Sequence, residues 1–475
     1  MFGFHRKMKR DSRDSVACRF MAPILACMAM FVAGAVRSEP FAAGSIETCP
    51  PIPLNSSERT LLLQALQSSG TLGAATDTAS ARALRRYATA LAGLRVKPSR
   101  IDSLWAIEPT PRDIAAEFEA ARAAGAIDAW LAGLEPPSPE FRRLLVERCR
   151  YQATVDAGGW SELPAGATLG ARATGPAVEM MRARLKAEGY AVGPAPAAQT
   201  LDPDLTAALR AFQRRHDLAD DGVLGPATVR ALNVSATARL AQIDANLERL
   251  RWLPRDLPGE RVEVDIGTQQ VTLFTAGRAT LTMRAIVGDP GHKTPMFASR
   301  LTSIVFNPPW NVPASIARNE ILPKAARDPG YLRRLHIIQT PQGLRQPPGP
   351  WNALGQIKFD LPSPFGVYLH DTSTRSLFAR ASRTLSHGCI RLEKPKALAV
   401  ELLAGQGWSA ADIDQTIAAG TTRRLELGVS PALFVLYRTV GVGDDGWVTF
   451  HQDVYGWDKQ LLAALDKFNL TARDL

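Results

Sequence analysis

The residues best suited to chemistry form a short run, residues 386–391, which reads Ser-His-Gly-Cys-Ile-Arg. Its cysteine, Cys389, attacks a carbonyl only as the thiolate, and an ordinary free thiol has a pKa of about 8.5. An imidazole beside the sulfur could take that proton. Gly388 lacks a side chain where a substrate must approach closely, and the N–H groups of Gly388 and Cys389 could hold an oxyanion. A lone cysteine is most often an inert buried side chain, but these neighbours favour a nucleophile for acyl transfer.

Two histidines compete as the base for this thiol. His387 lies two residues before Cys389, and side chains two apart in a strand point to the same face. His370 lies upstream, in the run 366–371, which reads Gly-Val-Tyr-Leu-His-Asp. Proximity along the chain therefore excludes neither histidine.

The longer string 385–392, Leu-Ser-His-Gly-Cys-Ile-Arg-Leu, together with His370 resembles the active-site signature of the YkuD-type L,D-transpeptidases, which rebuild bacterial peptidoglycan. The resemblance implies that Cys389 is the nucleophile and His370 the proton donor and acceptor. It also implies that the backbone carbonyl of Asp371 orients the imidazole and that the Gly388 N–H serves the oxyanion. Candidates for substrate binding are His387, Ser386, Arg391, Tyr368 and Trp310.

Each of these binding candidates also has a structural interpretation. Ser386 and Arg391 would hold either the loop or a substrate carboxylate. An arginine binds a carboxylate through two parallel hydrogen bonds, but a structural salt bridge is equally ordinary. Tyr368 and Trp310 would either line the peptide groove or belong to the core. Asp371 stands where relatives often carry a small residue, and its carboxylate would face either His370 or solvent.

The reaction implied by the resemblance is an acyl transfer in two halves. The thiolate attacks the carbonyl of the third residue of a stem tetrapeptide and expels D-alanine. The side-chain amine of a diaminopimelate in a neighbouring stem then attacks the thioester, which gives a 3→3 cross-link. No cofactor and no metal are expected.

Three alternatives remain open. Water in place of the amine would make the protein an L,D-carboxypeptidase or an amidase. A zinc hydrolase could use His370, His387 and Cys389 as ligands, although neither an HxxxD nor an HExxH element stands at these residues. The last alternative is a non-catalytic wall-binding protein.

The segments that would position these residues predict a multidomain α+β protein. It comprises an N-terminal helical scaffold, a small three-helix module and a C-terminal, mostly-β catalytic sandwich with an inserted lid. The predicted boundaries are a signal peptide at 1–37, a helical scaffold domain at 50–165, a peptidoglycan-binding-like module at 172–235, a helical connector at 236–260, a catalytic domain at 261–457 with an insertion at about 314–355, and a C-terminal helix or tail at 458–475.

Apolar residues recur at helical spacing before the catalytic domain. Asp113 is a predicted helix N-cap. The strings 212–216 and 221–233 resemble the peptidoglycan-binding domain 1 family, a three-helix module. The strings 101–105 and 158–160 resemble the region before the catalytic domain in the longer periplasmic L,D-transpeptidases.

From Arg261 onward the pattern changes to that of strands. Val262, Val264 and Ile266 alternate with polar residues, and strands dominate as far as His370. The insertion interrupts them with an expected helix from Ser315 to Arg327. Long loops in compact domains are often functional, which predicts a lid, with a passive surface excursion as the alternative.

Charge and cysteine usage bound the partners and the compartment. The formal net charge is +10, part of it in a basic N-terminus that precedes the apolar run 21–36, a pattern typical of a secretory signal peptide. An uncleaved leader would be the only membrane attachment. Nucleic acid is not an expected partner, because basic blocks with interleaved aromatics are lacking. The expected partners are peptidoglycan stem peptides, donor and acceptor, with wall-synthesis proteins as further candidates, in the periplasm of a Gram-negative envelope.

The mature chain would keep three of the 5 cysteines, since Cys18 and Cys27 lie in the leader. An exported protein meets an oxidising compartment. The odd count then leaves at least one thiol without an intramolecular partner. We expect a Cys49–Cys149 bridge, with Cys389 free.

Overall fold

The computed structural model describes Ile52, Leu62 and residues 79–164, 166, 170, 173–193, 199–443 and 445–468. The predicted signal peptide and Cys49 lie outside these residues, as do most of the helices expected between residues 50 and 78. Cys149 is disulfide-bonded, and Cys389 is a free thiol, so the pairing of Cys149 with Cys49 stays a prediction. Within the described ranges, the helices are all too short or too polar to span a bilayer.

The N-terminal region is helical, as predicted. Its helices are α3 (Ala79–Leu91), α4 (Pro98–Ile101), α5 (Ile114–Ala123), α6 (Ile127–Ala132) and α7 (Pro139–Asp156). Asp113 caps α5, because its carboxylate accepts the Ala116 N–H at 3.0 Å. Ser138 caps α7 in the same way, and Pro139 occupies the first turn, where its missing N–H costs nothing. Leu84, Tyr87 and Phe118 belong to the core of this region.

The small module consists of α8 (Pro176–Ala187), α9 (Pro203–Arg215) and α10 (Pro226–Leu232). All three helices carry a proline in the first turn. The expected apolar stripe of α8, Val178, Met181 and Leu185, lies in the module's core. The module also contacts the hairpin of β15 (Val440–Val442) and β16 (Val448–Phe450), where the rings of His216 and Phe450 stack with centroids 5.4 Å apart.

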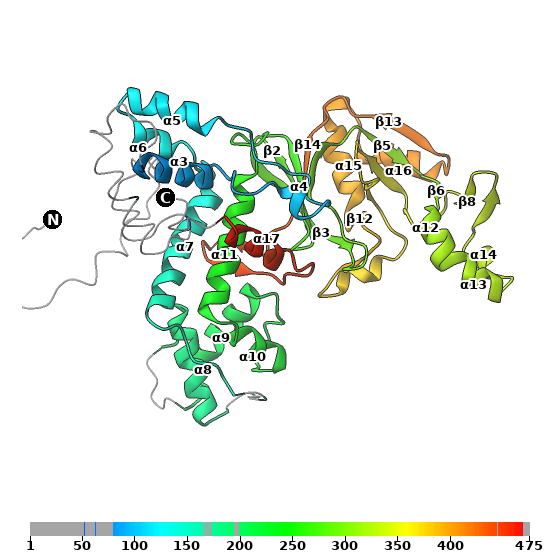
Figure 1. The fold of residues 1–475 in the computed structure, drawn as a ribbon. Coiled ribbons are helices and arrows are strands. Elements are labelled where there is room, and N and C mark those ends of the chain that lie inside the picture. Colours follow the sequence, from blue (N-terminus) through cyan, green and yellow to red (C-terminus); the bar gives the residue numbers. More distant parts are fainter. Residues whose placement is uncertain are drawn as a thin grey trace, which may run out of the picture. The chain divides into compact units, whose positions relative to one another are not determined.

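The connector is a single helix, α11 (Ala236–Arg251), which begins at its N-cap Ser235. It lies alongside α7 (Figure 1). A buried ion pair joins the two helices, with Arg148 Nε 2.6 Å from Asp244 Oδ1. The C-terminal helix α17 (Trp457–Asp466) packs against α11.

The predicted catalytic domain is built on one continuous sheet with the order β13-β5-β9-β10-β12-β3-β2-β1-β14-β4, to which β11 is added along β3. The strands are β1 (Arg261–Asp265), β2 (Gln270–Thr275), β3 (Arg278–Gly288), β4 (Phe297–Arg300), β5 (Ser303–Phe306), β9 (Ile357–Asp360), β10 (Leu369–His370), β11 (Thr384–Ser386), β12 (Ile390–Leu392), β13 (Arg423–Glu426) and β14 (Ala432–Leu436).

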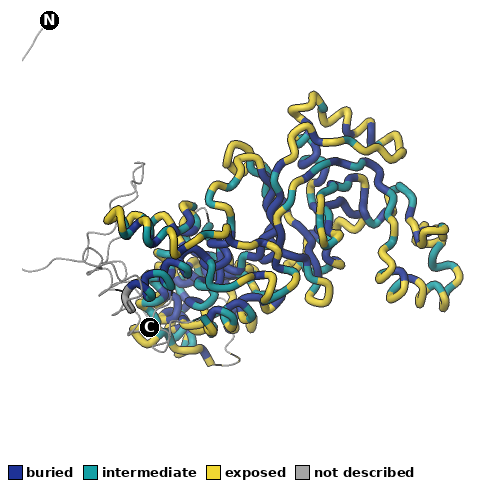
Figure 2. Tube along the Cα trace, turned by 45° about the horizontal axis from the view of Figure 1, so that its top comes forward, coloured by how far each residue is buried: buried dark blue, intermediate teal, exposed yellow. Residues whose placement is uncertain are grey.

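The long strand β3 joins the two layers expected of a sandwich. Its first part, from Arg278 to Arg284, pairs with β2, whereas Ala285 and Ile286 pair with β12. The sheet therefore curls instead of separating into two sheets. Figure 2 shows the buried residues running along it. The mostly-β prediction is confirmed, with this difference in connectivity.

The insertion contains helices and a small sheet of its own. The predicted helix is present as α12 (Ala314–Ile316), a π-helical turn η1 (Ala317–Ile321) and α13 (Leu322–Arg327), followed by α14 (Tyr331–Arg334). Strands β6 (Trp310–Asn311), β7 (Ile338–Thr340) and β8 (Gly343–Gln346) form the sheet. The sequence analysis did not predict α15 (Pro395–Leu403) and α16 (Ala410–Ala418), whose buried faces join the main core.

The segment after α4 completes the catalytic core from outside the predicted catalytic domain. Trp105 forms a parallel bridge with Met296, next to β4. Its buried ring lies between those of Trp252 and Trp457, with centroid distances of 6.0 and 5.6 Å. The N-terminal region and the catalytic sheet therefore share a core.

Candidate active site

The parallel pair of β10 and β12 positions the predicted catalytic residues. His370 lies opposite Arg391 in the register, and the Ile390 N–H donates to the Tyr368 carbonyl at 3.1 Å, which sets Cys389 beside Tyr368. Side chains two apart on a strand share a face. Tyr368, His370, Cys389 and Arg391 consequently point to one side of the pair and line the same cavity.

This cavity has a volume of about 250 Å³. The insertion and the β10–β12 pair together form its wall. Its lining residues are Trp310, Pro313, Ile316, Glu320, Ile321, Leu335, Ala353, Leu354, Tyr368, His370, Ser386, His387, Cys389 and Arg391. Seven of the nine residues predicted for the site are among them, and the other two, Asp371 and Gly388, were predicted to act through their backbone.

His370 is held in the tautomer that a general base requires. It is 4% exposed, and its Nδ1 lies 2.5 Å from the carbonyl oxygen of Asp371. A carbonyl only accepts, so Nδ1 carries the hydrogen and Nε2 of the neutral ring is the proton acceptor. Burial, helped by the charges of Arg391 and Lys358 and opposed by two backbone carbonyls, lowers the pKa of His370 to about 3. The ring is therefore neutral at pH 7.

Cys389 is a half-buried free thiol. Burial raises its pKa above the ordinary value. Hydrogen bonds from the Tyr368 backbone and hydroxyl oppose this rise in pKa, as do the charges of Lys358 and Arg391. The thiol and the imidazole that line this cavity are therefore both neutral at rest.

The loop before Cys389 differs from the expectation for Gly388 and Ser386. The Gly388 N–H donates to the Ser386 hydroxyl at 3.1 Å, and that hydroxyl donates to the Cys389 carbonyl at 2.6 Å. Ser386 is therefore used within the loop, and the Gly388 N–H is not free for an oxyanion. In the described part of the chain, the Cys389 N–H has no hydrogen-bond partner, which leaves it as the available donor.

The positive φ of Gly388 and the hydroxyl of Thr294 fix the conformation of this loop. Gly388 has a φ of +101°, in the region that favours glycine. Thr294, which the sequence analysis did not single out, donates its hydroxyl hydrogen to the Gly388 carbonyl at 2.8 Å and accepts the Gly288 N–H at 2.9 Å. The loop is thus tied to the end of β3. Only the three-dimensional pairing reveals this role, because Thr294 lies far from the motif in the sequence.

His387 faces the insertion. Its Nε2 lies 2.5 Å from Oε1 of Glu320 in η1. A carboxylate accepts, so Nε2 carries a hydrogen that points at Glu320 and has no lone pair for the thiol. The hydrogen bond fixes the tautomer of His387 and turns its Nε2 away from the thiol, whereas His370 lies on the cavity face of the β10–β12 pair, which favours His370 as the base. Nothing in the sequence pointed to Glu320, beyond its place in the insertion.

The side chain of Asp371 has hydrogen-bond partners within the protein, whereas that of Arg391 has none among the described residues. Arg391 is half-buried, makes no ion pair within the described residues, and its buried Nε has no hydrogen-bond partner there. The carboxylate of Asp371 is buried, lies 2.6 Å from Arg375 Nη1, and accepts the Gln356 N–H at 2.9 Å. Asp371 therefore supports its own loop instead of facing solvent, whereas Arg391 has donors available for a ligand on the cavity side.

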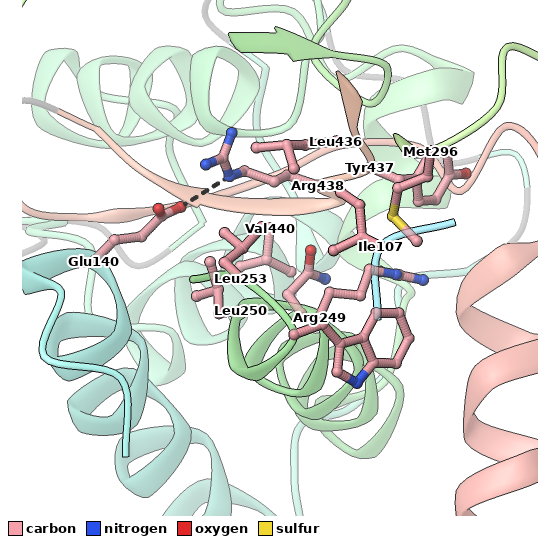
Figure 3. A pocket seen from close by; sticks show the side chains of 12 residues that line it. Ile107, Glu140, Arg249, Leu250, Leu253, Met296, Leu436, Tyr437, Arg438 and Val440 are labelled. Carbon is pink, nitrogen blue, oxygen red and sulfur yellow. Dashed lines mark ion pairs between the residues drawn. The ribbon is translucent and has the colours of Figure 1, made fainter. Parts of the chain in front are cut away.

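The described residues contain no cluster of three histidine, cysteine or acidic side chains arranged to hold a metal ion. Figure 3 shows a second cavity, bordered by α11 and the strand β14, where Arg438 Nε lies 3.4 Å from Glu140 Oε1. It has a volume of about 20 Å³. That is room for about one water molecule, so it cannot take a peptide.

Three segments of the chain match known families. Residues 259–408 match the L,D-transpeptidase catalytic domain, YkuD. Residues 174–232 match a "putative peptidoglycan binding domain", and residues 53–147 match a scaffold domain. A protein of Haemophilus influenzae named "Putative L,D-transpeptidase" is 32% identical over 251 residues, which cover 48% of this chain and 50% of that protein. The chain thus spans about half the length of this curated relative.

Solved structures of L,D-transpeptidases are also similar to parts of the chain. One from Mycobacterium smegmatis is 17% identical, with a TM-score of 0.22, over 38% of this chain and 58% of that chain. One from Stackebrandtia nassauensis is 13% identical, with a TM-score of 0.23, over 56% of this chain and 94% of that chain. On the family matches, residues 259–408 are similar to the L,D-transpeptidase catalytic domain of the YkuD family, and residues 174–232 are similar to a peptidoglycan-binding domain.

Proposed function

We propose that this chain is a cysteine L,D-transpeptidase that forms 3→3 cross-links in peptidoglycan through a thioester on Cys389. One observation carries the proposal: a free thiol and a neutral imidazole lie on one face of the β10–β12 pair and line a cavity of about 250 Å³. The imidazole has its acceptor nitrogen available because Nδ1 is bound to the Asp371 carbonyl. A thiol paired with an oriented base is the arrangement that nucleophilic acyl transfer requires.

In the first half of the proposed reaction, the Cys389 thiol gives its proton to His370 Nε2 and the sulfur attacks the carbonyl of the third stem residue. The Cys389 N–H, which lacks a protein partner among the described residues, faces the developing oxyanion. His370 then passes the proton to the departing D-alanine amine. The C–N bond breaks and a thioester remains.

In the second half, the side-chain amine of a neighbouring stem attacks the thioester carbonyl. A C–N bond forms and the C–S bond breaks. His370 takes a proton from the amine and returns it to the leaving sulfur, so the enzyme is restored. Arg391, with its half-buried guanidinium and no acidic partner in the described residues, would bind a carboxylate of a stem peptide.

The cellular setting follows from the same proposal. The match to a peptidoglycan-binding domain supports peptidoglycan as the polymer on which the enzyme acts. The predicted signal peptide would deliver the protein to the periplasm, where its activity would serve cell-wall organisation and cell shape.

Substitution of the nucleophile tests the proposal. Cys389→Ala is expected to abolish both the covalent adduct with a carbapenem, read by intact-protein mass, and dimer formation from a tetrapeptide stem. His370→Ala should lower both strongly, and His336→Ala, which removes an exposed histidine of the insertion, should change neither. Dimers formed by the Cys389→Ala protein would refute the proposal. Wild-type protein that yields only trimmed tripeptides would redirect it to a carboxypeptidase.

A further inference from the structure

Glu320 lines the cavity but has no role in the reaction proposed above. It is the only acidic residue among those that line the cavity, and Arg391 is the only arginine or lysine there. The remaining wall is mostly apolar. The described cavity thus carries one negative and one positive site, with the nucleophile in the same wall.

The carboxylate of Glu320 is held beside the nucleophile loop. Its Oε1 accepts from His387 Nε2 at 2.5 Å, and His387 is two residues before Cys389. The His387 ring packs on His292, with centroids 4.5 Å apart, and His292 Nδ1 lies 3.1 Å from Asp289 Oδ1. This chain of contacts orients His387, and through it Glu320.

The second oxygen of Glu320 is available. Within the described residues, Oε2 makes no hydrogen bond, and the side chain is 39% exposed. A carboxylate oxygen has lone pairs for more than one donor. Oε2 could therefore accept from a ligand while Oε1 stays bound to His387.

The insertion fixes the direction of this side chain. Glu320 lies in the π-helical turn η1, a rare geometry that is frequent at functional sites. Ala317 and Ile321 of the same turn are buried in the insertion's own core. Packing of those residues sets the face of the turn that carries Glu320.

In the second half of the proposed reaction, the incoming acceptor carries a positive charge that a carboxylate can bind. An alkyl amine has a pKa near 10.4, so the acceptor arrives as an ammonium ion. The charges of Arg391 and Lys358 act on His370 and repel a cation from its neighbourhood. The Glu320 carboxylate in the same cavity offsets that repulsion. A water acceptor would gain nothing from it.

We propose that Glu320 forms the acceptor subsite and binds the ammonium group of the incoming amine through Oε2; this rests on the proposed transpeptidase function. In the transfer, the C–N bond forms and the C–S bond breaks. The ammonium loses two protons in all. One passes through His370 to the sulfur, and the other leaves to solvent through the exposed carboxylate. Glu320 thus selects an amine over water.

Three variants of the full chain test this role, with a tetrapeptide stem as both donor and acceptor. Glu320→Gln keeps the shape and removes the charge, Glu320→Asp keeps the charge, and Asp328→Asn removes an exposed acid of the same insertion that pairs with Arg334 outside the cavity. Mass spectrometry gives the ratio of cross-linked dimer to trimmed tripeptide. Intact-protein mass gives the rate of acylation by a carbapenem.

For Glu320→Gln we expect the dimer-to-tripeptide ratio to fall about tenfold, which corresponds to about 1.4 kcal/mol, while carbapenem acylation changes less than twofold. Glu320→Asp should recover much of the ratio, and Asp328→Asn should match the wild type. An unchanged ratio in Glu320→Gln overturns the inference, as does a parallel fall in acylation, which would mean that Glu320 serves the donor or the fold.

The wild-type protein separates the two proposals. If it forms no covalent adduct, the proposed function itself fails. If it is acylated but releases only tripeptide, the thioester chemistry stands and the acceptor subsite is wrong. Dimer formation that depends on Glu320 supports both.

Discussion

The imidazole of His370 is expected to stay unprotonated far below the pH at which an ordinary histidine takes up a proton. Burial lowers its pKa from the ordinary 6.5 to about 3, with the positive charge of Arg391 as the next cause. On the alkaline side, burial holds the pKa of the Cys389 thiol above its ordinary value. Between these limits the thiol and the base are both neutral, so the acylation rate should not depend on pH.

The size of the effect follows from the two pKa values. At pH 5, an imidazole with a pKa of 6.5 is roughly 3% unprotonated, whereas one with a pKa of about 3 is roughly 99% unprotonated. If only the unprotonated ring takes the proton of the thiol, an ordinary histidine would lose about 30-fold in rate between pH 7.5 and pH 5. His370 should lose almost nothing.

The assay is the second-order rate constant for acylation by a carbapenem, read by intact-protein mass between pH 5 and pH 8. Circular dichroism at each pH checks that the protein stays folded. We expect a flat profile for the wild type and for His336→Ala. A 30-fold fall with an apparent pKa near 6.5 would refute the reasoning, because it would mean that solvent reaches the ring of His370.

Two further predictions concern the loop and the module. Gly288→Ala would place a Cβ 2.0 Å from the His292 carbonyl oxygen, so the backbone must move, whereas the new Cβ in Gly388→Ala has its nearest atom at 3.5 Å and costs mainly about 1–2 kcal/mol for the positive φ. We therefore expect Gly288→Ala to lower the melting temperature and the acylation rate more than Gly388→Ala does. Equal effects of the two variants would contradict this. Burial lowers the pKa of His216 to about 4, so between pH 6.5 and pH 4 the unfolded state binds more protons than the folded state. The free energy of unfolding should therefore fall by about 3 kcal/mol as the pH drops through this range. Urea titrations at pH 7 and pH 4.5 should show a smaller fall in this free energy for His216→Gln than for the wild type, and equal falls would refute the prediction.

The strands of the main sheet and the helices of the small module were predictable because their sequence patterns are local. The stripe from Val178 to Leu185 marks the buried face of a helix. The alternation from Val262 to Ile266 marks a strand, although the structure buries its polar residues as well. The candidate nucleophile could be named from the sequence for a different reason, since its loop is contiguous in the sequence and its chemistry is specific to a thiol. The continuous curl of the sheet was not predictable, because the exchange of partners along β3 depends on which distant strands reach it.

The details of the site that were not predicted all involve residues distant in sequence. The proposed choice of His370 over His387 as base gains geometric support only when Glu320 is seen to hold His387. The Gly388 N–H was assigned to the oxyanion because the sequence could not show that the Ser386 hydroxyl turns back to accept it. Thr294 and Glu320 have no motif, and their roles follow from the packing of the loop after β3 and of the insertion against the β10–β12 loop.

The position of β14 has a consequence for any shortened version of the protein. This strand, Ala432–Leu436, pairs on one side with β1 and on the other with β4, yet it lies beyond residues 259–408, which match the catalytic family. A fragment cut at those limits would leave two unpaired edges that invite aggregation, and it would lack Trp105 as well. During synthesis, β1 and β4 must likewise remain without this partner until the later strand β14 has been made. A fragment that folds on its own must therefore be longer than residues 259–408, the segment that matches the family.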